Sequence, residues 1–148
     1  MKANSAICEL LPPSDEPFVA RVVSEARRKN PPPFASLDVY ELALRQPVDE
    51  GAVIPVERIR GGVFLAAGGD DIVWPSLAMA RAMEKRLKAK RFRQPVVLRE
   101  YPLAGHQIGP PGYRVPSPPA GGTAFDTAQA GADAWTRALE FLKANLTR

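Results

Sequence analysis

Two short apolar runs on either side of an amphipathic stretch form the clearest pattern in the chain. Residues 62–67 and 95–101 are rich in valine, leucine and alanine and are bounded by glycine or proline, which is typical of buried strands. Between them, residues 76–91 carry apolar side chains at helical spacing, on a face formed by Leu77, Ala80, Met83 and Leu87. A strand, a helix and a second strand in this order predict a parallel pair joined by a right-handed crossover.

Three further segments have the pattern of amphipathic helices. Residues 14–29 begin at a serine N-cap and stop before an Asn-Pro pair, and a shorter segment, 36–46, begins at a second serine. The last segment, 125–146, keeps a helical period throughout, with a stripe formed by Phe125, Ala128, Ala132, Trp135, Leu139, Leu142 and Leu146. We expect this stripe to cover one face of the sheet.

A long loop precedes the last helix. Residues 109–122 are rich in proline and glycine, which excludes a helix or a central strand there. Loops of this length are often functional. Two interpretations stay open: a lid over an acyl pocket, with Tyr113 as an apolar contact, or an unstructured segment.

Length and composition favour one α/β domain over residues 1–148, with a helical N-terminal segment at 1–30. The apolar runs are far shorter than the roughly 20 residues that cross a bilayer. Because the N-terminus also lacks the apolar core of a signal peptide, we expect a cytoplasmic protein without membrane contact. The only cysteine, Cys8, has no neighbouring cysteine or histidine, so we expect no metal and no cofactor.

The net charge of +4 comes largely from one basic cluster, formed by Lys85, Arg86, Lys88, Lys90, Arg91 and Arg93. Cations at the end of a helix complement its dipole, so we interpret the cluster as a solvated helix face. A phosphate-bearing ligand is the alternative. Nucleic acid is not expected as a partner, because Phe92 is the only aromatic residue within the cluster and no recognition motif is present.

An acid and a base follow the two predicted strands. Asp71 comes soon after the first, and His106, the only histidine, after the second. The carboxyl ends of parallel strands share one edge of a sheet, with neighbouring strands about 4.8 Å apart, so the two side chains are expected within hydrogen-bonding reach. Such a pair fixes a histidine tautomer and supports proton transfer. We prefer Asp71 over Asp70 because its spacing to Pro75 places it at the turn into the helix.

Structural roles are the alternative for both residues. Asp71 can cap the helix that begins near Ser76, and His106 can be a loop histidine whose ring is satisfied by a backbone carbonyl. A nucleophile on a Gly-x-Ser-x-Gly turn is missing from the sequence. The remaining candidates are Cys8, Ser5, Ser14, Ser24, Ser36, Ser76 and Ser117. Several of these serines are better explained as helix caps.

Several stretches of the chain together resemble a known family. They are residues 54–76, residues 101–106, residues 121–123 and the Ala-Trp pair in the last helix. They are similar to the C-terminal part of the acyl-CoA thioester hydrolase and bile acid-CoA:amino acid N-acyltransferase family, which has the α/β-hydrolase fold. The resemblance covers residues 31–148, and residues 1–30 have no counterpart in it.

The resemblance implies a truncated C-terminal half of an α/β-hydrolase, a small parallel sheet with flanking helices. It implies Asp71 as the triad acid and His106 as the triad base. The family's nucleophile, a serine or cysteine, lies upstream of the segment that corresponds to Met1. The substrate class it implies is a small-molecule ester or an acyl-CoA.

Two functions from different classes remain. The first is an esterase or thioesterase that uses Asp71 and His106 with a nucleophile not yet identified. The second is a non-catalytic scaffold derived from a hydrolase, folded through self-association. Both predict a homodimer, because a sheet of two strands leaves unpaired edges.

Overall fold

The structure is a computed structural model that describes residues 37, 40–41, 51, 53–115 and 120–146. The chain divides into two compact units, Met1–Ile54 and Pro55–Arg148. In the first unit, Leu37, Tyr40 and Glu41 are helical, in agreement with the predicted segment 36–46. The rest of that segment and the predicted helix 14–29 lie outside the described residues. The single domain over the whole chain stays a prediction, and every element below belongs to the second unit.

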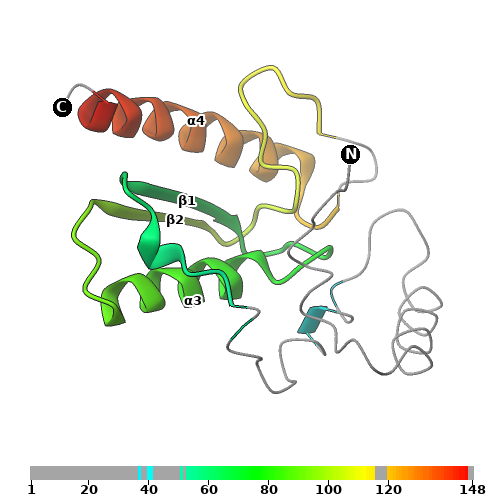
Figure 1. Ribbon diagram of the computed structural model, residues 1–148. Coiled ribbons are helices and arrows are strands. Elements are labelled where there is room, and N and C mark those ends of the chain that lie inside the picture. The colour runs from blue at the N-terminus through cyan, green and yellow to red at the C-terminus, as the bar shows by residue number, and fades with distance from the viewer. Residues whose placement is uncertain (1–36, 38–39, 42–50, 52, 116–119, 147–148) are drawn as a thin grey trace, which may run out of the picture. The chain divides into compact units, whose positions relative to one another are not determined.

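A parallel pair of strands forms the centre of the second unit. Strand β1 (Val63–Gly68) pairs with β2 (Val96–Tyr101) in a register that runs from Val63 opposite Val96 to Gly68 opposite Tyr101. Helix α3 (Ser76–Ala89) connects them, and the 3-10 turn η2 (Val56–Arg58) precedes β1 (Figure 1). The predicted strand, helix and strand are therefore confirmed.

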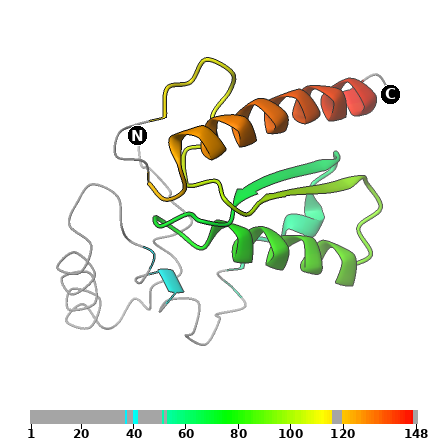
Figure 2. The same ribbon diagram turned by 180° about the vertical axis from the view of Figure 1, so that it is seen from behind.

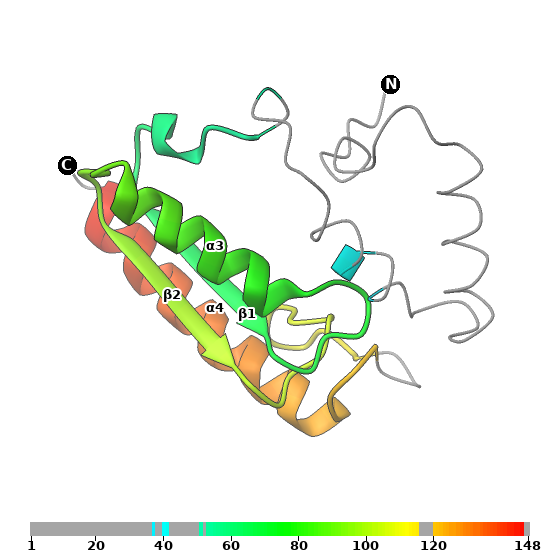
Figure 3. The same cartoon turned by 90° about the horizontal axis from the view of Figure 1, so that it is seen from below.

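Helices cover the two faces of this sheet. Helix α3 lies on one face and the long helix α4 (Ala124–Leu146) on the other, so the second unit has three layers (Figures 1 and 2). Viewed from the α3 side, the strands pass between α3 in front and α4 behind (Figure 3). The structure confirms the α/β class and a small parallel sheet with flanking helices, consistent with a C-terminal α/β-hydrolase fragment.

Helix α3 packs with the face that the sequence predicts. Ala80 and Leu87 are buried, and Leu77 and Met83 are partly buried. The helix ends at Ala89 because Arg91 takes a positive φ of 53° and the Phe92 N–H donates to the carbonyl of Leu87 at 3.0 Å. This arrangement terminates helices by satisfying carbonyls of the last turn.

The prediction for α4 was wrong about which face packs inward. The residues it buries are small: Thr127, Ala130, Gly131 and Ala134. The predicted stripe is exposed along its whole length, with Phe125 at 70% and Leu146 at 74%. The reason is close packing, since a Cβ on Gly131 would overlap the carbonyl oxygen of Gly109. Only a face of small side chains lets the helix approach the loop so closely.

Charged pairs tie α3 to its neighbours. Arg86 binds Glu57 of η2 in a bidentate pair at 2.7 and 2.8 Å, and Arg81 binds Glu100 of β2 in the same way at 2.7 Å. The hydrogen bond from Arg86 lowers the pKa of Glu57 to about 2. Two members of the basic cluster are thus engaged within the protein, because Lys88 also pairs with Glu84 at 2.9 Å.

The predicted loop has neither helix nor strand at 109–115 and 120–122, the part that the structure describes. An isolated antiparallel bridge joins Gly122 to Ala104. Among the described residues, no helix combines the length and the apolar character needed to cross a membrane.

Candidate active site

The two loops that leave the carboxyl edge of the sheet bring Asp71 and His106 together. Asp71 follows the end of β1 by three residues, and His106 follows the end of β2 by five. The loops are joined by backbone hydrogen bonds from Gly69 to Tyr101 at 2.9 Å and from Asp70 to Ala104 at 3.0 Å. As a result, His106 Nδ1 lies 3.0 Å from Asp71 Oδ2, the contact expected from the topology.

The Asp71 carboxylate is held by four donors. Its Oδ1 accepts from the backbone N–H groups of Val73 at 2.8 Å and Trp74 at 3.2 Å. Its Oδ2 accepts from the Ser76 hydroxyl and from His106. The residue is only 5% exposed. An ionised carboxylate accepts hydrogen bonds at both oxygens, so this environment fixes its position and orientation.

The alternative role of Asp71 as the cap of α3 is not what the structure shows. The N-cap position of α3 is Pro75, and no side chain caps the helix. Asp71 instead closes the turn that precedes the helix, through Val73 and Trp74. The same backbone contacts hold the carboxylate toward His106.

Ser76 is the one proposed nucleophile that lies within the described residues. Its hydroxyl donates to Asp71 Oδ2, so it supports the acid and does not cap α3. Cys8, Ser117 and the four serines before residue 37 lie outside the described residues.

Neighbouring backbone and one buried threonine fix the position of His106. The backbone N–H of His106 donates to the carbonyl of Ala120 at 2.9 Å. The preceding N–H, that of Gly105, donates to Thr127 Oγ1 at 3.0 Å, and Thr127 is completely buried in α4. Helix α4 therefore supports the loop that carries His106 through Thr127, a residue to which the sequence analysis assigned no role.

Trp74 contacts both nitrogens of the imidazole. Its indole Nε1 lies closest to His106 Nδ1 and 3.1 Å from Nε2, and the ring centroids are 5.2 Å apart. Because a carboxylate facing Nδ1 requires a proton there, Nε2 is left with the lone pair, and the indole N–H donates to it. The imidazole side chain is 28% exposed.

Gly121 and Asp70 hold the loop before α4 against the loop that follows β1. Gly121 has a φ of +83°, and a Cβ on it would overlap the carbonyl oxygen of Asp70. The Asp70 carboxylate is exposed and accepts from the N–H of Gly122 at 3.0 Å, so it supports the loop. The Gly-Gly pair at 121–122 is the sequence signal for this contact, since only glycine readily takes such a conformation.

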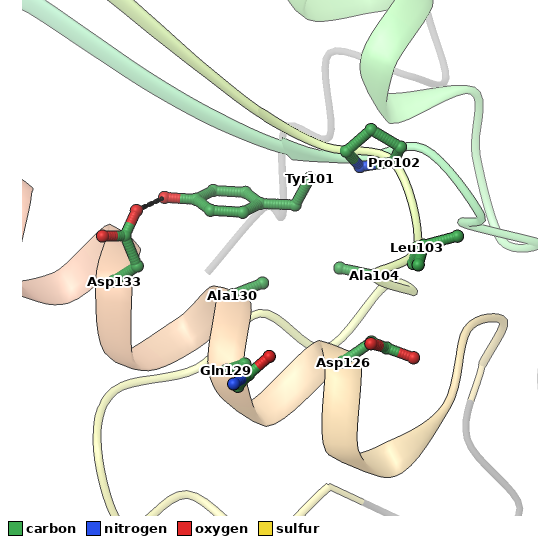
Figure 4. A pocket seen from close by; sticks show the side chains of 8 residues that line it. All are labelled: Tyr101, Pro102, Leu103, Ala104, Asp126, Gln129, Ala130 and Asp133. Carbon is green, nitrogen blue, oxygen red and sulfur yellow. Dashed lines mark hydrogen bonds between the residues drawn. The ribbon is translucent and has the colours of Figure 1, made fainter.

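A pocket of about 380 Å³ opens between the end of β2 and α4 (Figure 4). Its lining residues are Tyr101, Pro102, Leu103, Ala104, Asp126, Gln129, Ala130 and Asp133. The Tyr101 hydroxyl donates to Asp133 Oδ2 at 2.8 Å, and burial together with this bond raises the pKa of Tyr101 to about 12. Two carboxylates lie on the wall of this pocket, and Arg137 pairs with that of Asp133 at 2.8 Å.

No group of three or more histidine, cysteine or acidic side chains that could hold a metal ion occurs within the described part of the chain. An imidazole whose Nδ1 is bound by a fixed carboxylate is oriented to take and return protons at Nε2.

Comparisons with known proteins agree with this geometry. The family described as BAAT / Acyl-CoA thioester hydrolase C terminal matches residues 29–148. The chain is 45% identical over 76 residues to rat "Acyl-coenzyme A thioesterase 2, mitochondrial", covering 51% of this chain and 16% of the relative. It is 31% identical over 121 residues to mouse "Acyl-coenzyme A thioesterase 5", covering 75% and 28%.

A third relative is mouse "Peroxisomal succinyl-coenzyme A thioesterase", 33% identical over 107 residues, which cover 64% of this chain and 25% of the relative. The chain thus matches between 16% and 28% of the length of these relatives. The match over residues 29–148 includes both strands, both helices and the Asp71–His106 pair. The chain belongs to the BAAT / acyl-CoA thioester hydrolase C-terminal family.

Proposed function

We propose that Asp71 and His106 are the acid and the base of a site that hydrolyses carboxylic esters or acyl-CoA thioesters. The observation that carries the proposal is the 3.0 Å contact between His106 Nδ1 and a buried carboxylate that four donors hold in place. The nucleophile comes from outside the described residues. Support for the substrate class comes from the names of the relatives, which are acyl-coenzyme A thioesterases.

The chemistry follows from the orientation of the ring. Nε2 of His106 takes the proton of a serine hydroxyl or cysteine thiol as that group attacks the acyl carbon. The imidazolium then gives this proton to the departing thiol or alcohol, and Asp71 stabilises its charge. Water repeats the sequence on the acyl intermediate and releases the acid. Throughout these steps Asp71 keeps the proton on Nδ1.

Trp74 has to move for this chemistry to occur. Its indole N–H lies 3.1 Å from Nε2, the atom that must accept the proton of the nucleophile. Arrival of the nucleophile therefore replaces one hydrogen bond to Nε2 by another, at small net cost.

A non-catalytic scaffold is the second candidate function. Two contacts favour it: the hydroxyl of Ser76 is committed to Asp71, and the indole of Trp74 occupies Nε2. In that case the pair serves to hold the two loops together, and the chain acts through the surfaces it offers to partners.

Hydrolysis assays separate the two candidates. Short-chain p-nitrophenyl esters and an acyl-CoA are offered to the wild-type chain, to His106→Ala and to Asp71→Asn, with Lys85→Ala as a control on the exposed face of α3. We expect wild-type hydrolysis to fall at least about 100-fold in both site variants and to be unchanged in the control. Absent activity, or activity equal in all four proteins, would contradict the hydrolase and favour the non-catalytic scaffold.

Partners and location are also proposals. We propose a small-molecule acyl substrate, no nucleic acid, no membrane contact and a homodimer. The cytoplasmic location stays a prediction, since two of the relatives carry mitochondrial or peroxisomal in their names. Fractionation of cells that express the tagged chain would test it.

A further inference from the structure

The seven exposed residues that form the α4 stripe have the spacing of a helix-pairing surface. Counting along α4, the intervals between them are three, four, three, four, three and four residues, a heptad repeat over three full heptads. They are Phe125, Ala128, Ala132, Trp135, Leu139, Leu142 and Leu146. Trp135, Leu139 and Leu142 remain 46%, 40% and 45% exposed. A repeat of this period is typical of a surface against which a second helix packs.

Strand β1 has a free edge that lacks protection. In the described part of the chain, β1 pairs only with β2. Its sequence, Val-Phe-Leu-Ala-Ala-Gly, contains neither a charge nor a proline. The other outer strand, β2, carries exposed Arg99 and Glu100. Proteins protect genuine edge strands with such charges, so the edge of β1 has the composition of a covered strand and that of β2 does not.

The α4 stripe and the free edge of β1 lie on the same flank of the second unit. Asp133 on α4 points toward β2, where it accepts from Tyr101 at 2.8 Å (Figure 4). An α-helix turns by about 100° per residue, so Trp135 points about 200° away from Asp133. The stripe therefore faces away from β2, on the side where β1 is open. We call these two features together the open flank.

The sizes of the stripe residues indicate a second copy of the chain in antiparallel orientation. The small residues Ala128 and Ala132 lie in the N-terminal half of the stripe, and Leu139 and Leu142 in the C-terminal half. Antiparallel knobs-into-holes packing places Ala128 opposite the partner's Leu139. Parallel packing would place alanine opposite alanine and leave voids in the N-terminal half of the interface.

The residues beside the stripe do not oppose such pairing. One side is formed by Gln129, Thr136 and Lys143. The other is formed by Ala138, Asn145 and Gly131, of which Gly131 is buried against the loop at Gly109. Only one of these six is charged, and the antiparallel register that sets Ala128 opposite Leu139 places Lys143 near the partner's Ala124. Like charges therefore do not meet along the interface, whereas in parallel packing the two lysines would lie at the same level.

We propose that two copies of the chain associate through their open flanks, with the α4 stripes packed antiparallel about a two-fold axis. The same axis makes the two β1 edges antiparallel, an orientation in which their backbone groups can pair. This inference rests on the homodimer proposed above and gives its interface. It is independent of the proposed hydrolysis, because none of its residues belongs to the Asp71–His106 site.

Sedimentation equilibrium tests the interface with matched variants of the 148-residue chain. Leu139→Glu and Ala144→Glu place the same carboxylate on α4, the first within the stripe and the second outside it. We expect a wild-type dimer at micromolar concentration, a dissociation constant at least about 100-fold weaker in Leu139→Glu, and no change in Ala144→Glu. Circular dichroism of each variant checks that α4 remains helical.

Disulfide cross-linking then tests the orientation, in a Cys8→Ser background. Antiparallel packing predicts cross-linked dimers when Ala128→Cys and Leu139→Cys are combined, and none with Ala128→Cys alone. The proposal is overturned if the wild-type chain is a monomer, if Leu139→Glu dimerises like the wild type, or if Ala128→Cys alone cross-links.

Discussion

Two regions of the second unit differ in how completely one chain pairs their polar atoms and buries their apolar side chains. The acid–base corner, formed by Asp71, Trp74, Ser76 and His106, has its polar atoms paired with one another and with nearby backbone. No buried side-chain nitrogen or oxygen lacks a partner among the residues described. The open flank exposes large apolar side chains and an uncharged strand edge.

The difference teaches that the geometry of the corner is a local property. Two loops, one turn and the first turns of α4 are enough to place an imidazole against a carboxylate. The open flank depends on packing that the second unit does not contain, because apolar area gains stability only when it leaves water. Substitutions in the corner should therefore change the stability of a single chain, and substitutions in the flank should change association.

Among the residues that support the corner, the largest effect on stability is expected at Gly121. A side chain there would meet the Asp70 carbonyl and hold the backbone at a φ that L-residues rarely adopt. We expect Gly121→Ala to lower the free energy of unfolding by about 3 kcal/mol, measured by urea denaturation.

Gly112 is the matched control for this effect. Its φ is +85°, but a Cβ on it would meet nothing within 4 Å. Gly112→Ala should cost about 1 kcal/mol, the contribution of backbone conformation alone. Equal losses in the two variants would mean that the close approach of Gly121 to Asp70 does not support the corner.

A smaller effect is expected at Thr127, which joins α4 to the histidine loop. Thr127→Val keeps the shape of the side chain and leaves the buried N–H of Gly105 without its acceptor. The expected loss of unfolding free energy is about 2 kcal/mol. Thr136→Val is the control, since that exposed hydroxyl donates to the carbonyl of Ala132 within the helix, and it should change stability by less than about 0.5 kcal/mol. An equal loss of unfolding free energy in the two variants would mean that the hydrogen bond from Gly105 to Thr127 does not support the loop that carries His106.

The smallest effect is the loss of stability at alkaline pH that Tyr101 causes. Burial, then the hydrogen bond to Asp133, raises the pKa of Tyr101 to about 12, above the ordinary value of 10.0. The neutral phenol is therefore the form that the fold favours. Its contribution is fully present below pH 10 and is lost as the pH rises through about 12.

Ultraviolet titration can follow this group, with the Tyr101→Phe chain subtracted from the wild type. Asp133→Asn removes the negative acceptor, so tyrosinate should form at a lower pH in that variant. An unchanged midpoint would show that the contact between α4 and β2 seen at the pocket does not hold in solution.

Sequence reasoning reached the corner through topology. The two apolar runs and the helix between them predicted a parallel pair, and a parallel pair brings Asp71 and His106 to one edge. Trp74 and Thr127 were missed because their roles depend on contacts with residues more than 20 positions away in sequence. No local pattern records such contacts.

The face of α4 could not be predicted for a related reason. Periodicity predicts a helix and identifies its apolar stripe, and the usual inference is that the stripe packs inward. In this chain the approach of Gly131 to the loop at Gly109 decides the packing, and that depends on the path of a loop which the sequence predicts only as irregular.

The most direct test of the central claim is the tautomer of His106, read by nitrogen-15 nuclear magnetic resonance. The chain has one histidine, so the signals need no assignment. The spectrum is recorded at a pH at which the two ring nitrogens give the separate signals of a neutral imidazole. We predict a proton on Nδ1 and a lone pair on Nε2, with this preference lost in Asp71→Asn. A wild-type ring that carries its proton on Nε2 would contradict the account, because Asp71 would then not orient the base.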